Sequence, residues 1–236
     1  KQYEFVQNNP ECALLSCWVN VITEDKQQVR AEQFRSKYYY YNMIFDCWMY
    51  HPTVMYKKDA VLDVGGYKSA YAEDFDLFWH LSRKYKIDNV EEVLLDYRVT
   101  SQSLHQVTHK KEYDEALLYQ VKRNIGYYTG DSLALTNAEL ECSRFNFEPL
   151  IKLGSVFAVI KTLHKLDRLS AAVLDTPNVN LDIAGTTMAA WFRRTFIIRF
   201  FKKHFPPGKV LLFKILLKLS RPRVFPPGKT RQKAFL

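Results

Sequence analysis

The sequence predicts an α/β domain over about its first 105 residues and a helical region after it. Three observations carry this prediction. The run Cys12 to Ile22 is compact, apolar and rich in Val, Ile and Trp, which is typical of a buried strand. An amphipathic pattern at helical spacing begins at Glu73. The stretches 110–125 and 150–169 repeat their apolar residues at helical spacing, which predicts helices there.

The other expected elements of the α/β part follow from local signals. They are a helix over 1–7 that ends at Asn8-Asn9-Pro10, a turn at 23–26, a short strand at 53–56, a short helix at 57–64, and a strand at 93–99. Gly65 is the expected left-handed cap of the short helix. The aromatic-rich segment 36–45 fits either a helix or a loop.

The helical region divides into a connector and a tail. After the helix at 110–125, a turn-rich break is expected at 127–131 and a looser linker at 170–185, followed by two basic, apolar segments at 188–204 and 210–219. Each basic segment precedes Phe-Pro-Pro-Gly-Lys, at 205–209 and 225–229, a pattern that stops a helix. The predicted domains are therefore 1–108, 109–185 and 186–236.

Composition indicates a folded chain without a disulfide or metal framework. Of the 236 residues, 47% are hydrophobic, which is enough to form a core. The four cysteines show no Cys-x-x-Cys or Cys/His spacing of a zinc site, so reduced thiols are expected. No secretory signal pattern begins the sequence.

Charge is divided unevenly along the chain. Residues 1–182 carry 21 basic and 25 acidic side chains, whereas 13 Lys and Arg and no acidic residue follow Asp182. This asymmetry predicts that the tail meets an anionic surface. Neither basic segment has about 20 uncharged apolar residues, so a spanning helix is not expected. The mixture of Trp, Phe and Leu with Lys and Arg is typical of helices that lie in the headgroup plane of a membrane.

Two alternatives for the tail stay open. Its helices could dock on the α/β domain and expose a solvated basic face. Binding to nucleic acid is the weaker alternative, because the apolar density exceeds what phosphate contact needs and no recognition motif is present. We expect no nucleic-acid partner and a peripheral membrane protein of the cytoplasmic face.

The most informative motif is Ala-Glu-Asp-Phe-Asp-Leu at 72–77. A Gly-Gly turn at 65–66 precedes it, so two adjacent carboxylates, Glu73 and Asp74, fall in the first turn of a helix. Such a rigidly held acid beside a turn suits a general base. Acidic residues also favour helix starts for dipole reasons alone, which is the structural alternative.

Four motifs occur in a fixed order: His-Pro-Thr-Val-Met at 51–55, Val-Gly-Gly-Tyr at 64–67, the acidic motif at 72–77, and Leu-Leu-Asp-Tyr-Arg at 94–98. In order and spacing they resemble the acceptor-side half of a family 2 glycosyltransferase of the GT-A fold. The opening residues 1–11 resemble the helix that follows the Asp-x-Asp motif in that family. The resemblance covers residues 1 to about 105.

The resemblance implies roles for individual residues. Asp74 would be the catalytic base that takes the proton of an acceptor hydroxyl, with Glu73 as its neighbour. Independently of the resemblance, helical spacing turns Asp76 away from Asp74, which predicts a capping or structural role for it. Substrate contacts are implied for a further set of residues, namely His51, Gly65, Gly66, Tyr67 and Arg98. A turn that needs positive φ is the structural alternative for the two glycines, and a salt bridge at the edge of the core is the alternative for Arg98.

The resemblance also implies parts that the sequence does not contain. No Asp-x-Asp motif that follows a strand and no leading nucleotide-binding unit is present, since Asp74-Phe75-Asp76 lies on the predicted helix. The chain therefore corresponds to a partial GT-A domain without its N-terminal half. The family would use a nucleotide-sugar donor, a glycan or lipid-linked acceptor and a divalent cation, Mg²⁺ or Mn²⁺, with inversion. We assign no metal ligand within the chain. The alternative is a non-catalytic glycosyltransferase-like module that binds a glycan, a lipid or a partner protein.

Overall fold

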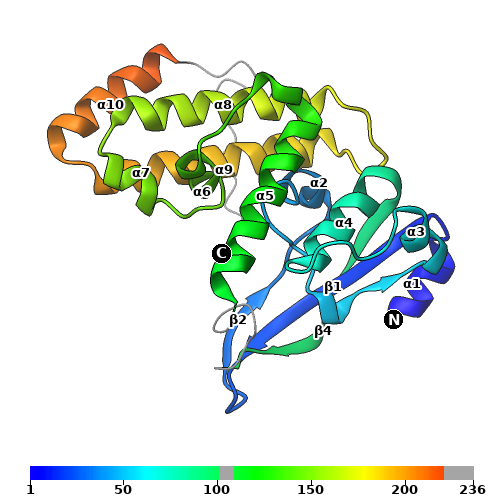
Figure 1. The fold of residues 1–236 in the computed structure, drawn as a ribbon. Coiled ribbons are helices and arrows are strands. Elements are labelled where there is room, and N and C mark those ends of the chain that lie inside the picture. Colours follow the sequence, from blue (N-terminus) through cyan, green and yellow to red (C-terminus); the bar gives the residue numbers. More distant parts are fainter. Residues whose placement is uncertain (101–108, 221–236) are drawn as a thin grey trace.

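The computed structural model describes residues 1–100 and 109–220. Over these residues the protein is mixed α/β, with a four-stranded mixed sheet and a group of helices beside it (Figure 1). The predicted α/β class is therefore correct at this level, and the helices expected after residue 109 are present. The second copy of the Pro-Pro-Gly pentapeptide, at 225–229, lies outside the described residues.

The sheet is built around one central strand, β1. Its strands are β1 (Cys12–Ile22), β2 (Gln28–Glu32), β3 (Met55–Tyr56) and β4 (Lys86–Arg98). β4 pairs with β1 in parallel along almost its whole length. β2 and β3 pair antiparallel with the C-terminal and N-terminal parts of β1, so they share its other edge.

The sequence of β1 explains its central position. Nine of its 11 residues are buried, so both faces of the strand are covered, as the continuous apolar run requires. Ser16 is fully buried within this run and donates to Asn89 Oδ1 of β4 at 2.8 Å. This hydrogen bond pairs two buried polar side chains across the two strands.

Short helices surround the sheet. They are α1 (Gln2–Asn8), α2 (Tyr39–Asn42), α3 (Lys58–Asp63) and α4 (Glu73–Lys84), with single 3₁₀ turns at Ser36–Tyr38 and His51–Thr53. The aromatic-rich segment 36–45, for which the sequence fits either a helix or a loop, thus begins with a 3₁₀ turn that is followed by α2. Leu77, Phe78 and Leu81 of α4 are fully buried in one apolar cluster with Leu14 of β1. This packing fixes α4 against the sheet.

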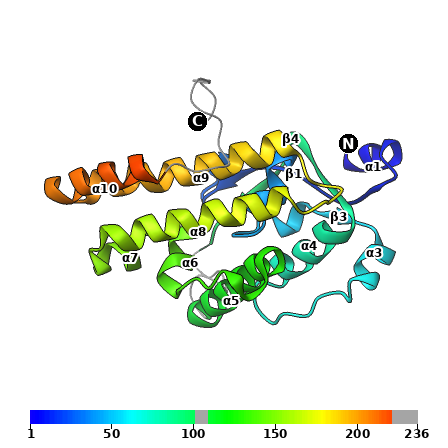
Figure 2. The ribbon, with the colours of Figure 1, turned by 90° about the horizontal axis from the view of Figure 1, so that it is seen from above.

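The remaining helices form the second part of the molecule. They are α5 (Lys110–Thr129), α6 (Asn137–Ser143), α7 (Glu148–Leu153), α8 (Val156–Leu174), α9 (Ile183–His204) and α10 (Pro207–Leu219), with a 3₁₀ turn at Gly130–Ser132. α8 and α9 lie side by side and run in opposite directions, and α10 follows at the far end of α9 (Figure 2).

Helix α9 is part of the core. The Arg193 side chain is buried, its guanidinium carbon lies 3.9 Å from the Phe45 ring centre, and one Nη donates to Asn42 Oδ1 at 2.8 Å. Ile197 and Phe201 are fully buried in the same cluster. The domain boundary expected between residues 185 and 186 therefore falls inside α9. This helix packs on the α/β part, as the first alternative for the tail states.

Several predicted bounds shift. β4 begins at Lys86 instead of 93, because its first half pairs with β1 although its sequence is polar. The helix predicted over 150–169 is two helices, since Gly154 in the left-handed region (φ 60°) ends α7. α5 continues to Thr129 through the break expected at 127.

Candidate functional site

A cleft of about 780 Å³ lies beside the start of α4. It is lined by β2, the segment 46–52, the loop before α4, the end of β4 and the start of α5. The lining residues are Arg30, Glu32, Phe34, Asp46, Cys47, Trp48, Met49, Tyr50, His51, Pro52, Ala70, Tyr71, Glu73, Asp74, Tyr97, His109 and Tyr113. Three of the seven residues singled out in the sequence are among them: His51, Glu73 and Asp74.

The acidic pair enters the cleft because of the backbone at Ala72. This residue is fully buried and takes left-handed angles (φ 51°, ψ 41°) as the N-cap of α4. A non-glycine residue in this region costs about 1–2 kcal/mol, so the turn needs support from its surroundings. The carbonyl oxygen of Ala72 accepts the Asp76 N–H at 3.1 Å, which starts the helix directly after the turn.

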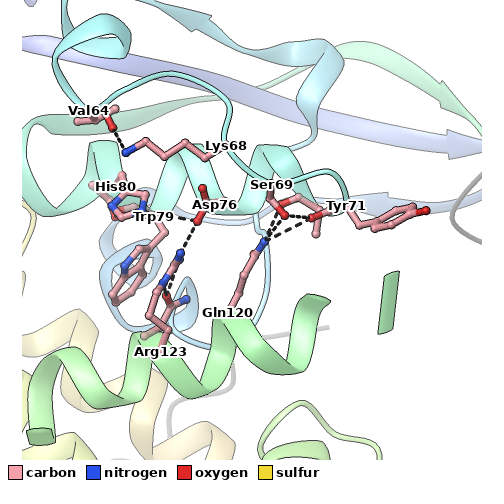
Figure 3. Close-up of polar contacts among 12 residues, drawn as sticks. Val64, Lys68, Ser69, Tyr71, Asp76, Trp79, His80, Gln120 and Arg123 are labelled. Atoms are coloured by element: carbon pink, nitrogen blue, oxygen red, sulfur yellow. Dashed lines mark hydrogen bonds and ion pairs between the residues drawn. The ribbon is translucent and has the colours of Figure 1, made fainter. Parts of the chain in front are cut away.

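Helix α5 supplies the support. Gln120, which is 2% exposed, donates from Nε2 to the Ala72 carbonyl oxygen at 3.1 Å and lies 3.5 Å from both Ser69 Oγ and the Tyr71 carbonyl oxygen. Figure 3 shows this side chain pointing from α5 to the loop that precedes α4. One amide therefore holds the turn that carries Glu73 and Asp74.

Asp76 has the structural role expected for it. Its carboxylate is buried, pairs with Arg123 of α5 and lies 3.5 Å from His80 Nε2 (Figure 3). Burial alone would raise the pKa of Asp76, but the hydrogen bonds from His80 and Arg123 outweigh it and lower the pKa to about 2. Asp76 thus joins α4 to α5.

Asp74 combines burial with access to the cleft. One of its carboxylate oxygens accepts the Phe75 N–H at 2.7 Å. Burial raises the pKa of Asp74, the Phe75 N–H and the nearby His51 oppose this rise, and the Glu73 carboxylate adds to it. A carboxylate whose proton affinity is raised is a better proton acceptor, which is the property that a general base needs.

His51 connects the predicted residues. Its Nδ1 lies 3.9 Å from Glu73 Oε1 and its Nε2 lies 2.9 Å from Tyr67 Oη. Tyr67 is therefore near the cleft through His51, although it does not line it. His51 is the first residue of the 3₁₀ turn His51–Thr53, and Pro52 follows it in this turn.

Gly65 and Gly66 serve the backbone in this structure. Both have positive φ (89° and 67°), and their N–H groups bond to the carbonyls of Leu62 and Val61, which ends α3. Neither glycine lines the cleft. Arg98 is exposed at the last position of β4, where its neighbour Tyr97 lines the cleft and strand alternation turns Arg98 to the other face.

Aromatic side chains form a wall of the cleft that the motif analysis missed. The Phe34 and Trp48 rings lie 4.3 Å apart, and the Tyr50 and Tyr97 rings 4.8 Å apart. The dense aromatics just before His51 are the signal that could have identified this wall. Arg30 and Glu32 of β2 are two positions apart, so their side chains lie on the same face of the strand, where they form an ion pair at 2.6 Å.

Cys47, the one cysteine among the described lining residues of the cleft, is partly buried and held in a hydrogen bond. Cys47 donates to the Met49 carbonyl at 3.2 Å, and burial, with the charge of Asp74 next in size, raises the pKa of its thiol well above the usual value. A thiolate nucleophile is disfavoured there.

The charge of the cleft is acidic. Among the described residues that line it there are four carboxylates, one arginine and two histidines, and the arginine is already paired with one of the carboxylates. Among residues 1–100 and 109–220, no group of three or more His, Cys, Asp or Glu side chains could hold a metal ion. Within the same residues, no helix is long and apolar enough to cross a membrane.

Comparison with known proteins gives one informative similarity. No protein-family model matches the chain. Over 112 residues, which are 44% of this chain, the sequence is 30% identical to the O-antigen biosynthesis glycosyltransferase WbnJ of Escherichia coli. The match covers 42% of that protein, so the chain spans less than half the length of the curated relative. The similarity supports a relationship to glycosyltransferases.

Proposed function

We propose that the protein is an inverting glycosyltransferase that moves a sugar from a nucleotide-sugar donor to a hydroxyl group of a glycan or lipid-linked acceptor. The observation that carries the proposal is the place of Asp74. It is a carboxylate of raised proton affinity on the rigid first turn of a helix, facing a cleft. The similarity to a bacterial glycosyltransferase supports the reaction class, and the motif order supports family 2 and the GT-A fold.

In the proposed reaction the acceptor hydroxyl lies against Asp74. The carboxylate takes the hydroxyl proton as the acceptor oxygen bonds to the anomeric carbon, and the bond from that carbon to the nucleoside diphosphate breaks. A single displacement of this kind inverts the anomeric centre. Glu73 would assist by raising the proton affinity of Asp74.

The other residues with predicted substrate contacts differ in how close they lie to the cleft. His51 lines the cleft and would contact substrate directly, with Tyr67 orienting its ring through the 2.9 Å contact. Gly65 and Gly66 would shape the approach through their turn. Arg98 lies on the face of β4 opposite to Tyr97, so a donation from it to phosphate would occur outside the cleft.

The acidic cleft indicates the acceptor side of the reaction. Carboxylates repel a diphosphate, whereas they accept hydrogen bonds from sugar hydroxyls, and aromatic walls suit the apolar faces of sugar rings. A Mg²⁺ or Mn²⁺ ion would offset the charge of the leaving diphosphate. The motif resemblance implies that the ligands of such an ion belong to the donor-side half of the family's domain, and we propose no metal site among the described residues.

We also propose that the protein works as a peripheral protein at the cytoplasmic face of a membrane. The basic C-terminal region carries this part of the proposal. It would bring the cleft to acceptors that are held at the bilayer surface.

The test is an assay of sugar transfer by the intact protein. Radiolabelled nucleotide-sugars are supplied together with a lipid extract of the source cells, and labelled product, released nucleoside diphosphate and anomeric configuration are measured. The expected result is transfer from one donor, with nucleoside diphosphate released in equal amount and inversion in the product. Binding of glycan or lipid with no transfer from any donor would favour the alternative of a non-catalytic binding module.

A further inference from the structure

Helix α10 exposes an apolar stripe to solvent. Leu211, Ile215 and Leu219 are spaced by four residues, so they follow one line along the helix. Their exposed fractions are 63%, 48% and 78%, and Leu212 beside them is 37% exposed. A contiguous exposed stripe of this kind marks an interaction surface more often than isolated exposed leucines do.

The opposite face of α10 fixes the direction of this stripe. Phe213 is fully buried, with its ring 5.8 Å from that of Phe205, and Leu216 and Leu217 pack against the same core cluster. Lys209, in the first turn, donates from Nζ to the Gly154 carbonyl at 2.6 Å. Because the buried face is occupied, the stripe cannot turn inward without unpacking the helix.

Lysines border the stripe. Lys214 and Lys218 are exposed on α10, and Lys202 and Lys203 are exposed in the last turn of α9. No acidic residue follows Asp182 in the sequence, so nothing on these two helices neutralises the lysines. The surface therefore combines apolar area with uncompensated positive charge.

Two arginines of the described part of the basic region do not take part in this surface. Arg193 is buried against Phe45, and Arg194 pairs with Asp167 at 3.0 Å. The basic and aromatic residues of α9 that the sequence pattern assigned to a membrane are thus partly used inside the protein. Within residues 183–220, the exposed apolar side chains that follow one line at intervals of four residues are those of α10.

We propose that the lysine-bordered stripe of α10 docks on an anionic lipid bilayer, with the helix lying in the plane of the headgroups. The four apolar side chains would enter the boundary of the acyl chains, and the lysines would meet lipid phosphates. The helix has 13 residues, which is too short to span the apolar layer and suits an interfacial position. This inference deepens the membrane association proposed above and does not depend on the transfer reaction.

Charge decides between the bilayer and other occupants. A second copy of this chain would bring the same lysines face to face, which is unfavourable. A nucleic acid would satisfy the lysines but would leave the leucines in water. An anionic bilayer satisfies both parts of the surface at once.

The experiment measures binding of the whole chain to vesicles of phosphatidylcholine alone and to vesicles that also contain phosphatidylglycerol. We expect binding to the anionic vesicles that weakens as salt is raised. The triple variant Leu211→Ala, Ile215→Ala and Leu219→Ala should bind at least about tenfold more weakly, because each change removes apolar area that enters the bilayer. The double variant Lys214→Gln and Lys218→Gln should also lose about tenfold or more.

The matched control is Leu62→Ala, because Leu62 is equally exposed (62%) but lies on α3. It should bind like the unchanged protein, and thermal unfolding should confirm that all variants are folded. Unchanged binding by the triple variant would overturn the assignment to α10 while leaving membrane association intact. Absence of binding by the unchanged protein, or equal binding to neutral vesicles, would overturn the inference, and neither result would bear on sugar transfer.

Discussion

Gln120 and Ala72 are 48 residues apart in the sequence, and the amide of Gln120 donates to the Ala72 carbonyl at 3.1 Å. Ala72 is the left-handed residue that directs Glu73 and Asp74 into the cleft. The helical part of the molecule therefore holds the acidic pair of the α/β part in place. Gln120 is a positioning residue, since it does not itself line the cleft.

The change Gln120→Leu keeps the size of the side chain and removes its hydrogen bonds. We expect the free energy of unfolding to fall by about 1 kcal/mol, because one buried carbonyl bond is lost. Turnover should fall by about tenfold, because the loss of this hydrogen bond would misplace the catalytic carboxylate of Asp74. Binding of the donor should stay unchanged.

Thermal unfolding and steady-state kinetics on the same preparations check this prediction. Tyr119→Ala is the control, since Tyr119 is the preceding residue of α5 and is 69% exposed. Equal turnover in Gln120→Leu and the control would mean that the contact does not position Asp74.

The change Asp76→Asn should destabilise the protein in a pH-dependent way. The pKa of Asp76 is lowered to about 2, so its ionised form stabilises the fold at pH values above the ordinary range of an aspartate. This contribution, about 2 kcal/mol, is lost as the pH falls from about 4 to about 2. The stability difference between the variant and the unchanged protein should therefore be largest near neutral pH and vanish towards pH 2. A difference that is constant with pH would contradict the ion pair with Arg123.

Two neighbours of Asp74 should move the pH dependence of turnover in opposite directions. Glu73 raises the pKa of Asp74 and His51 lowers it, although burial is the larger influence. Glu73→Gln should therefore shift the acidic limb of the rate profile to lower pH, and His51→Gln should shift it to higher pH. The measurement is kcat/KM against pH for both variants and the unchanged protein. Shifts of the same sign would show that another group limits the rate.

The parts of the fold that follow from local sequence are predictable. β1 has the bounds that its apolar run predicts, and α4 begins at Glu73, as the acidic first turn indicates. The left-handed glycine after α3 is likewise a local signal. The first half of β4 is not predictable in this way, because polar residues form a strand there only through pairing with β1.

The residues of the site likewise differ in whether the sequence could predict them. The motif order identifies Asp74, Glu73 and His51, and the structure brings these three to one cleft. Gln120 could not be found from the sequence, because its role depends on a contact across 48 residues. The burial of Arg193 was equally hidden, since a basic residue among aromatics fits a membrane surface as well as it fits a core.

The central claim is that Asp74 is the proton acceptor, and turnover by Asp74→Asn in the intact protein tests it most directly. Asp46→Asn is the matched control, because Asp46 is an exposed carboxylate of the same cleft. We predict that Asp74→Asn loses at least about a hundredfold in kcat while donor binding survives, and that Asp46→Asn keeps turnover within a few-fold. Near-normal turnover by Asp74→Asn would contradict the claim.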